Sequence, residues 1–161
     1  MKKQNLSHYS ITPTHKYKNV KIGIVVSEWN EPITNALKEG ALAFLYEAGI
    51  TKKQIVVQTV PGSYELPYGV TTLLDFDDDI YVVICLGCII QGETRHFEFI
   101  AQAVANGIMK VSLDYAIPVI FGVLTCDTLE QAQERAGGKH GNKGVEAAYT
   151  CLKMLEIELN N

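Results

Sequence analysis

The sequence predicts a three-layer α/β/α sandwich, in which a parallel sheet of about four strands carries helices on both faces. Short apolar runs rich in β-branched residues alternate along the chain with longer segments that repeat apolar residues at helical spacing. Strands that alternate with helices pair in parallel, because each helix crosses back over the sheet. The length of 161 residues suits one compact domain, and no repeat or low-complexity segment divides it. We therefore expect a single domain over residues 1–161.

The first half of that domain holds an arm and two strands, each strand followed by a helix. Residues 1–19 have weak periodicity and form either a frayed tail or an arm that docks elsewhere. A strand is indicated over 20–26, and the next helix opens at Asn30, a plausible N-cap, and ends at Gly49. A second strand over 54–60 leads through Pro-Gly-Ser into a further helix. The apolar stripe of the first helix is Ile33, Leu37, Ala41, Phe44, Leu45 and Ala48.

The second half repeats this alternation. The run over 80–88 is apolar throughout, as in a central parallel strand, and 117–124 is a further strand. Thr128 and Gln131 have the spacing of a capping box that starts a short helix. The turn GGKHGNKG, a connection rich in left-handed conformations, precedes the last helix. The helix after 80–88 is marked by Phe97, Ile100, Ala101, Val104, Ile108 and Val111. The last helix is marked by Val145, Ala148, Leu152, Leu155 and Leu159.

The composition argues against several classes of partner. A net charge of −4 and a pI near 5.5 leave no broad basic face, so we expect no nucleic-acid partner. No apolar run approaches the roughly 20 residues of a membrane span. The two lysines at the start lack an apolar segment behind them, so we expect no secretory signal and a cytoplasmic protein.

The cysteine pattern needs a separate judgement. Cys85 and Cys88 have the C-x-x-C spacing of redox and zinc motifs. They lie in a predicted strand, where residues three apart point to opposite faces of the sheet. No second Cys/His pair follows at zinc-finger spacing. We therefore expect buried thiols, with no metal and no redox cofactor.

The stretch QGETRHFEFI, which follows the most continuous strand, predicts an anion site. Ligands of open α/β sheets bind beyond the carboxyl ends of the strands. Gly92 allows a sharp turn from strand to helix, so the N–H groups of Glu93, Thr94 and Arg95 point into the cleft and suit a phosphate. His96, in the first turn, lies beside the same anion, and histidine exchanges protons near neutral pH. The alternative for His96 is a place on a solvated helix start.

Five other side chains carry weaker signals. Trp29 follows a strand end, a place suited to stacking on a planar ring, and Tyr64 is a candidate for shaping the same mouth. Glu65 either accepts hydrogen bonds from a ligand or complements the start of its helix. Phe121 lies inside VIFGVL, where a core position is the default. Arg135 either binds a phosphate with two parallel hydrogen bonds or is a solvated residue near a helix end.

The segments GIVVSEWNEPIT, VPGSYELP, LGCIIQGETRHFEFI, IPVIFGVLT and ERAGGKHGNKGVEAA cover the chain from Val20 to the last helix. In order and spacing they resemble the lumazine synthase family. The resemblance implies a flavodoxin-like sheet and a transferase of riboflavin biosynthesis that needs no cofactor. Its two small-molecule substrates are 5-amino-6-(D-ribitylamino)uracil and 3,4-dihydroxy-2-butanone 4-phosphate. Its products are 6,7-dimethyl-8-ribityllumazine, phosphate and water.

The resemblance also implies the roles of individual residues. His96 matches the catalytic proton-transfer residue. Trp29 and Phe121 cover the pyrimidine, and Arg135 and the 93–94 segment bind the phosphate. The remaining substrate contacts come from the two strand-end segments 63–65 and 88–90. The full substrate-binding set is Trp29, Ser63, Tyr64, Glu65, Cys88, Ile89, Ile90, Glu93, Thr94, Phe121 and Arg135. Many members have Phe in place of Trp29, Thr or Ser in place of Cys88 and a small residue in place of Glu93.

Assembly is a further expectation from the resemblance. Members of the family form pentameric rings, and some build twelve rings into an icosahedral shell, whereas members that stop at pentamers tend to carry an insertion in the turn before the last helix. The turn GGKHGNKG is short, so we expect a 60-subunit homo-oligomer built from pentamers. The arm of residues 1–19 is expected to pair with a neighbour's sheet edge. Trp29, Glu65 and His96 then share a site with Phe121 and Arg135 of the adjacent chain.

Two other functions compete with this one. A hydrolase that uses Cys88 and His96 would need a thiolate of depressed pKa. A flavin-binding or shell-forming protein without enzymatic activity is compatible with the fold alone. The presence of both His96 and Arg135 favours an enzyme.

Overall fold

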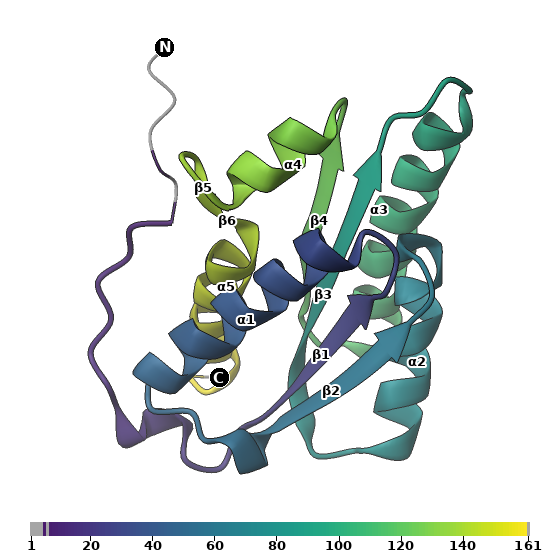
Figure 1. Ribbon diagram of the computed structural model, residues 1–161. Helices are drawn as coiled ribbons and strands as arrows, with labels where there is room; N and C mark the ends of the chain where they lie inside the picture. The colour runs from purple at the N-terminus through teal and green to yellow at the C-terminus, as the bar shows by residue number, and fades with distance from the viewer. Residues whose placement is uncertain (1–4, 6, 161) are drawn as a thin grey trace.

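The computed structural model describes residues 5 and 7–160, and its main sheet has four parallel strands in the order β2-β1-β3-β4 (Figure 1). The strands are β1 Lys21–Ser27, β2 Ile55–Val60, β3 Ile80–Ile90 and β4 Val119–Cys126. The main helices are α1 Glu31–Glu47, α2 Leu66–Phe76, α3 His96–Tyr115, α4 Leu129–Arg135 and α5 Lys143–Glu158. The predicted α/β/α class is therefore confirmed.

Helices cover both faces of this sheet, which explains why its two central strands, β1 and β3, are almost entirely buried. Helices α1 and α5 lie on one face, and α2 and α3 lie on the other (Figure 1). Ile24 faces α1 and α5, the next residue, Val25, faces α2 and α3, and both are fully buried. A strand with two buried faces loses the polar–apolar alternation of a half-exposed one.

The same alternation of faces separates the C-x-x-C cysteines. Cys85 packs in the core under α2 and α3, whereas Cys88 packs in the core under α1 and α5. All four cysteines of the chain are buried and free. The prediction that the two thiols of this pair point to opposite faces is confirmed.

The helices of the sandwich are amphipathic. Helix α3 buries Val104 and Ile108 against the sheet and exposes Gln102 and Lys110 on its outer side. Within residues 5 and 7–160, no helix combines the length and the apolar character needed to cross a membrane.

The glycine-rich turn before α5 is a small hairpin. Strands β5 (Ala136–Gly138) and β6 (Gly141–Asn142) pair antiparallel. Gly137 and Gly141 have φ values of 117° and 89°, so the predicted left-handed conformations are present at these two positions. The pattern did not predict the pairing, because a two-residue strand is too short to show alternation.

The helix before this hairpin begins as predicted, although its capping differs. Thr128 Oγ1 accepts the Gln131 N–H at 3.3 Å, and α4 starts at Leu129. Gln131 Oε1 accepts the N–H of Asp127 at 2.9 Å, one residue before the expected partner. Only one of the two capping-box bonds therefore forms as the spacing predicts.

The N-terminal arm lies on helices α1 and α5 of its own chain. The Tyr9 ring stacks on Tyr149 with centroids 4.0 Å apart and meets the edge of Phe44. The Tyr17 hydroxyl donates to Glu156 Oε1 at 3.2 Å. The described part of the arm therefore has contacts within its own chain, and its pairing with a neighbour's sheet edge stays a prediction. Residues 1–4 and 6 of the predicted arm lie outside the described residues.

Candidate active site

The loops that follow β1 and β2 are tied together at the carboxyl end of the sheet. The Glu28 N–H donates to the Val60 carbonyl at 2.8 Å, and the Trp29 N–H donates to the Pro61 carbonyl at 2.9 Å. A Cβ at Gly62 would lie 2.6 Å from Cε3 of the Trp29 ring, so glycine at 62 is needed for the ring to lie there. Trp29 is nevertheless 66% exposed and presents a flat apolar surface.

The Cys88 carbonyl, near the end of β3, faces side chains from two neighbouring loops. Asn30 Nδ2 donates to it at 3.0 Å, and the Ser63 hydroxyl lies 3.5 Å away. A Cβ at Gly87 would come within 2.6 Å of Ser63 Oγ, so glycine lets Ser63 approach the strand. Asn30 is the N-cap residue of α1 as predicted, but its backbone is left-handed (φ 61°) and its side chain bonds to β3 instead of to the N–H groups of the helix.

The segment between β3 and α3 places His96 at the first position of the helix, close to its expected place. The His96 N–H donates to Thr94 Oγ1 at 3.4 Å. The N–H groups of Glu93, Thr94 and Arg95 find no hydrogen-bond acceptor among the described residues. They are therefore available to an anion beside the start of α3.

The reason predicted for Gly92 in this segment is wrong. Its φ lies outside the left-handed region, and a Cβ there would contact nothing within 4 Å. The turn itself does not require glycine, because β3 continues to Ile90 and the chain then reaches α3 over several residues.

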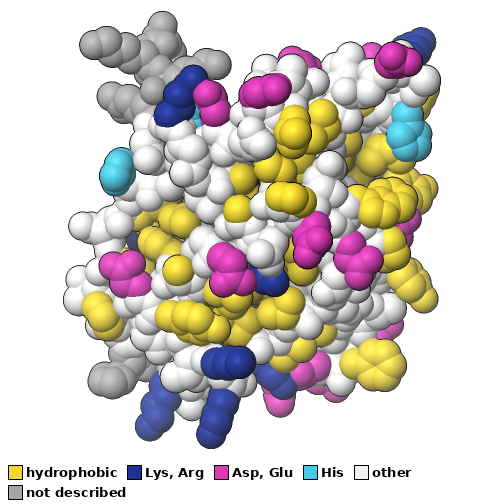
Figure 2. All heavy atoms as spheres, in the orientation of Figure 1, with side chains coloured by type: hydrophobic (Ala, Val, Ile, Leu, Met, Phe, Trp, Pro, Cys, Tyr) yellow, Lys and Arg dark blue, Asp and Glu magenta, His cyan; other side chains and the backbone are white. Residues whose placement is uncertain are grey.

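A pocket of about 250 Å³ opens where these segments meet. It lies beyond β1 and β3, at the point where the strand order of the sheet reverses, which is the usual ligand site of this architecture. Figure 2 shows exposed hydrophobic side chains and a histidine over the start of α3. The predicted residues that line the pocket are Trp29, Ser63, Tyr64, Cys88, Ile89, Ile90, Thr94 and His96.

The pocket also contains residues that were not predicted as site residues, namely Asn30, Gly92, Phe97 and Ile100. Phe97 and Ile100 were expected on the core face of α3, and they are half-buried there. Both residues lie in the first turns of a helix that starts at the pocket, and this position could have indicated that they line the site. A residue there faces both the sheet and the mouth of the site.

Four predicted residues do not line this pocket: Glu65, Glu93, Phe121 and Arg135. Glu65 Oε2 accepts the Gly62 N–H at 3.0 Å, which is the helix-start role foreseen as its alternative. Phe121 lies on β4, an outer strand of the sheet, and is 37% exposed rather than a core residue. Arg135 ends α4 and bonds to the hairpin and to α5.

The thiol of Cys88 is unsuited to nucleophilic chemistry. Burial, with a smaller contribution from the nearby Cys126, raises its pKa to about 12. A thiol that stays protonated near neutral pH does not attack a carbonyl. The hydrolase that pairs Cys88 with His96 therefore finds no support in this geometry.

We expect iodoacetamide at about pH 8 to leave Cys88 unmodified in the native protein. With a pKa near 12 its thiolate fraction is about 10³-fold below that of an ordinary thiol, and only 4% of the residue is exposed. Mass spectrometry after timed labelling measures this, and the chain in denaturant is the control. Rapid native labelling with loss of activity would instead support a nucleophilic Cys88.

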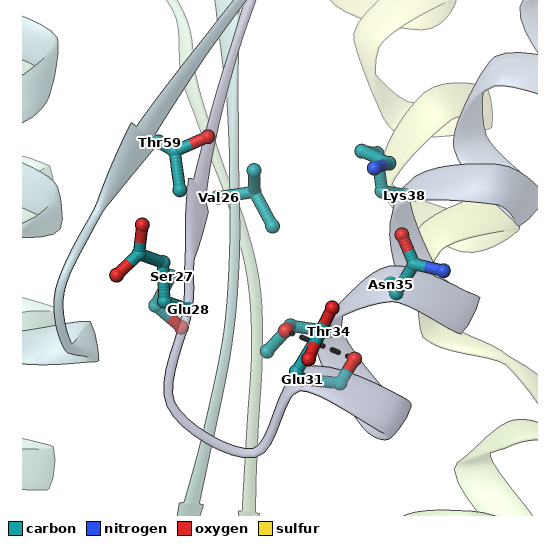
Figure 3. A pocket seen from close by; sticks show the side chains of 8 residues that line it. All are labelled: Val26, Ser27, Glu28, Glu31, Thr34, Asn35, Lys38 and Thr59. Carbon is teal, nitrogen blue, oxygen red and sulfur yellow. Dashed lines mark hydrogen bonds between the residues drawn. The ribbon is translucent and has the colours of Figure 1, made fainter.

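A larger hollow of about 440 Å³ lies between the ends of β1 and β2 and helix α1 (Figure 3). Its lining is Val26, Ser27, Glu28, Glu31, Thr34, Asn35, Lys38 and Thr59. The Ser27 hydroxyl is buried there and bonds to no described residue, while Thr34 Oγ1 donates to the Glu31 carbonyl at 3.5 Å. This lining includes no aromatic ring and none of the predicted site residues, so it is a poor place for a planar substrate.

The fold and the smaller pocket define a doubly wound α/β protein with a small-ligand site at the switch point of its sheet. An exposed indole, unpaired backbone N–H groups and a histidine converge there, as in enzymes that act on planar and anionic substrates.

The chain belongs to the 6,7-dimethyl-8-ribityllumazine synthase family, whose model matches residues 19–158. The synthase of that name from Cytophaga hutchinsonii is 55% identical over 152 residues, which cover 94% of each chain. The one from Porphyromonas gingivalis is 48% identical over 154 residues, covering 96% of this chain and 95% of the relative. The one from Parabacteroides distasonis is 46% identical over 154 residues, covering 96% of each chain.

Proposed function

We propose that this chain condenses 5-amino-6-(D-ribitylamino)uracil with 3,4-dihydroxy-2-butanone 4-phosphate to give 6,7-dimethyl-8-ribityllumazine, phosphate and water. The observation that carries the proposal is the pocket at the β1–β3 switch point in a chain of this family. Its exposed Trp29 ring suits a pyrimidine, and the unpaired N–H groups of residues 93–95 suit a phosphate.

The reaction needs proton transfers and one stabilised anion. A pyrimidine amine adds to the ketone carbon of the butanone, and loss of water gives an imine. The C–O bond to phosphate then breaks, and the second amine closes the ring with loss of another water. His96, on the pocket wall, exchanges the protons, while the N–H groups before α3 hold the phosphate as it leaves.

The remaining contacts are assigned to residues that line the pocket and to Glu65 and Glu93, which adjoin lining residues in the chain. Ser63 and Tyr64 face the ribityl and pyrimidine groups, and the backbone of residues 88–90 flanks the ring. Glu65 Oε2 is held by the Gly62 N–H, whereas its Oε1 has no partner among the described residues and accepts a ribityl hydroxyl. Glu93 and Thr94 contribute through their backbone N–H groups.

An assay with the two substrates tests this function. The purified chain should form a fluorescent lumazine and one equivalent of inorganic phosphate only when both substrates are present. Omission of either substrate is the control. A chain that binds the pyrimidine but forms no product at micromolar enzyme would support the non-enzymatic alternative. The four free, buried cysteines fit a reducing compartment, so we place this activity in the cytoplasm.

We further propose that the chain assembles into pentamers and that twelve pentamers form a shell. Support comes from the outer face of α3, where Phe99, Met109 and Leu113 are 64%, 60% and 73% exposed. With Gln102 and Asn106 they follow the alternating three- and four-residue spacing of a helix seam. Exposed apolar rows of this kind are covered in assemblies. The short hairpin before α5 agrees with the family members that build shells.

Replacement of Leu113 by Asp is expected to break the particle into smaller species. Five copies of this position would meet around a ring axis, and the added charges would repel each other there. Analytical ultracentrifugation at neutral pH in phosphate buffer measures the change. Phe76→Asp, at a 92% exposed position on α2, is the matched control and should keep the wild-type mass. A wild-type chain that sediments as a monomer would contradict the assembly.

The active site is, we propose, shared between adjacent chains of the ring. This is consistent with Phe121 and Arg135 lying outside the pocket that contains Trp29 and His96. A cyclic interface is heterologous, so it joins two different patches of the same chain.

Co-expression of His96→Ala with Arg135→Ala tests the shared site. Each variant alone should be impaired at every interface. In randomly mixed rings about one site in four receives both wild-type halves, so activity should recover towards a quarter of the wild-type value. Native mass spectrometry verifies that the rings are mixed. Mixed rings no more active than the single variants would show that each chain contains its whole site.

A further inference from the structure

The guanidinium of Arg135 is held at one of its three nitrogens. Nη1 donates to the His140 carbonyl at 2.7 Å and lies 2.7 Å from Glu146 Oε1. The side chains of Arg135 and Glu146 are only 21% and 12% exposed, so water screens this pair less than a surface pair. Nη1 therefore has one hydrogen bond and one ion pair within the chain.

The other edge of the same guanidinium is open. Arginine has five N–H donors, and the pair on Nε and Nη2 points in one direction and matches two phosphate oxygens. Neither Nε nor Nη2 has an acceptor among the described residues. Glu146 therefore contacts Nη1, and the Nε–Nη2 edge remains open to a phosphate.

The N-terminal arm closes over Glu146. The Ser7 hydroxyl accepts the Asn142 N–H at 2.6 Å and lies 3.5 Å from Glu146 Oε1. Asn142 caps α5 by accepting from the N–H of Gly144 at 2.8 Å. One turn after Glu146, the ring of Tyr149 carries the stacked Tyr9. The arm, the start of α5 and the Arg135 pair thus form one connected cluster.

The pKa of Tyr9 reports the same proximity. Burial raises it first, and the negative charge of Glu146 raises it further, while Arg135 acts in the opposite direction. The Tyr9 hydroxyl therefore senses both members of the pair.

We propose that Glu146 is a positioning residue, which holds Nη1 of Arg135 so that the Nε–Nη2 edge faces the substrate phosphate, and that the docked arm shelters this pair. The proposal rests on the proposed function, because it assigns Arg135 to the phosphate of the butanone substrate. It adds the N-terminal arm, through Ser7 and Tyr9, to the residues that determine phosphate affinity.

The test combines steady-state kinetics with calorimetric titration of inorganic phosphate into the full-length protein. Glu146→Ala should raise KM for the phosphorylated substrate and weaken phosphate binding by about 5–20-fold, as for a lost charged contact. KM for the pyrimidine substrate should change less than about twofold. Ser7→Ala should give a smaller change in the same direction. Glu156→Ala is the matched control, because Glu156 also lies on α5 and bonds to the arm but is not paired with Arg135.

A double-mutant cycle separates positioning from general damage. In an Arg135→Ala background, Glu146→Ala should weaken phosphate binding no further, since the group that it orients is gone. Equal additional loss in that background, or equal effects on both substrates, would overturn the proposal. So would a wild-type chain that binds no phosphate at about 10 mM. If the wild-type chain binds phosphate but forms no lumazine, the proposed function fails, while the cycle still tests the pair.

Glu146→Gln keeps the test decisive if the alanine variant does not fold. Its amide oxygen still accepts from Nη1, so phosphate affinity should fall by no more than about threefold. A loss as large as that of Arg135→Ala would show that the charge of Glu146 acts directly on the ligand rather than through Arg135.

Discussion

Replacement of His96 by Ala is expected to slow turnover by about 10²–10⁴-fold, the range for a lost general acid–base residue. His96 begins α3 on the wall of the pocket, and the unpaired N–H groups of the preceding segment are available to an anion beside it. Imine formation and ring closure both move protons between nitrogen, oxygen and solvent. Substrate binding should survive, because Trp29 and the strand ends are untouched. Single-turnover kinetics with titration of the pyrimidine measure both quantities.

The controls for this variant separate proton transfer from packing. His96→Gln retains a hydrogen-bonding side chain but cannot exchange protons, and it should be nearly as slow as His96→Ala. His8→Ala, at an exposed position on the arm, should turn over like the wild type. A His96 variant with the wild-type rate throughout about pH 6–8 would remove His96 from the mechanism.

Replacement of Arg135 by Ala should weaken binding of the phosphorylated substrate by about 1.5–3 kcal/mol, the scale of a charge-assisted hydrogen bond. That corresponds to roughly 10–150-fold in affinity. The effect should fall on KM for this substrate, while KM for the pyrimidine changes much less, because the proposed role of the guanidinium is to bind the phosphate alone.

A matched arginine controls for charge in this experiment. Arg95 lies beside the pocket but is 80% exposed and pairs with Glu98 on the surface, so Arg95→Ala should change phosphate affinity less than Arg135→Ala. Equal losses of affinity for both substrates in Arg135→Ala would exclude a phosphate-specific role.

The sheet and its helices could be predicted because the same physical pattern repeats in each unit. Strands buried on both faces are mostly apolar, and the helices that cover them repeat apolar residues at helical spacing. The strands β1 and β3 can therefore be recognised from the sequence. The docking of the arm could not be predicted. It depends on stacking between Tyr9 and Tyr149, which are far apart in the sequence, and no local pattern records such a contact.

The candidate site likewise has features that the sequence predicts and features that it does not. Trp29 and His96 could be predicted as neighbours, because parallel strands bring their carboxyl ends to one edge. The Asn30 amide on the Cys88 carbonyl could not, since it needs a left-handed backbone at a non-glycine residue. The hydrogen bond from Gly62 to Glu65 was foreseen only as an alternative, because a carboxylate near a helix start serves either purpose.

The bond from Asn30 to the Cys88 carbonyl has a consequence for redesign of the pocket. The group fixed there belongs to the main chain, so a change of the side chain at 88 need not alter the position of this carbonyl. Attempts to evolve acceptance of other heterocycles should therefore leave 88 alone. Mutant libraries at Trp29 and Tyr64, whose side chains are 66% and 56% exposed, would change the shape of the pocket mouth. The backbone contacts beneath the mouth would stay the same.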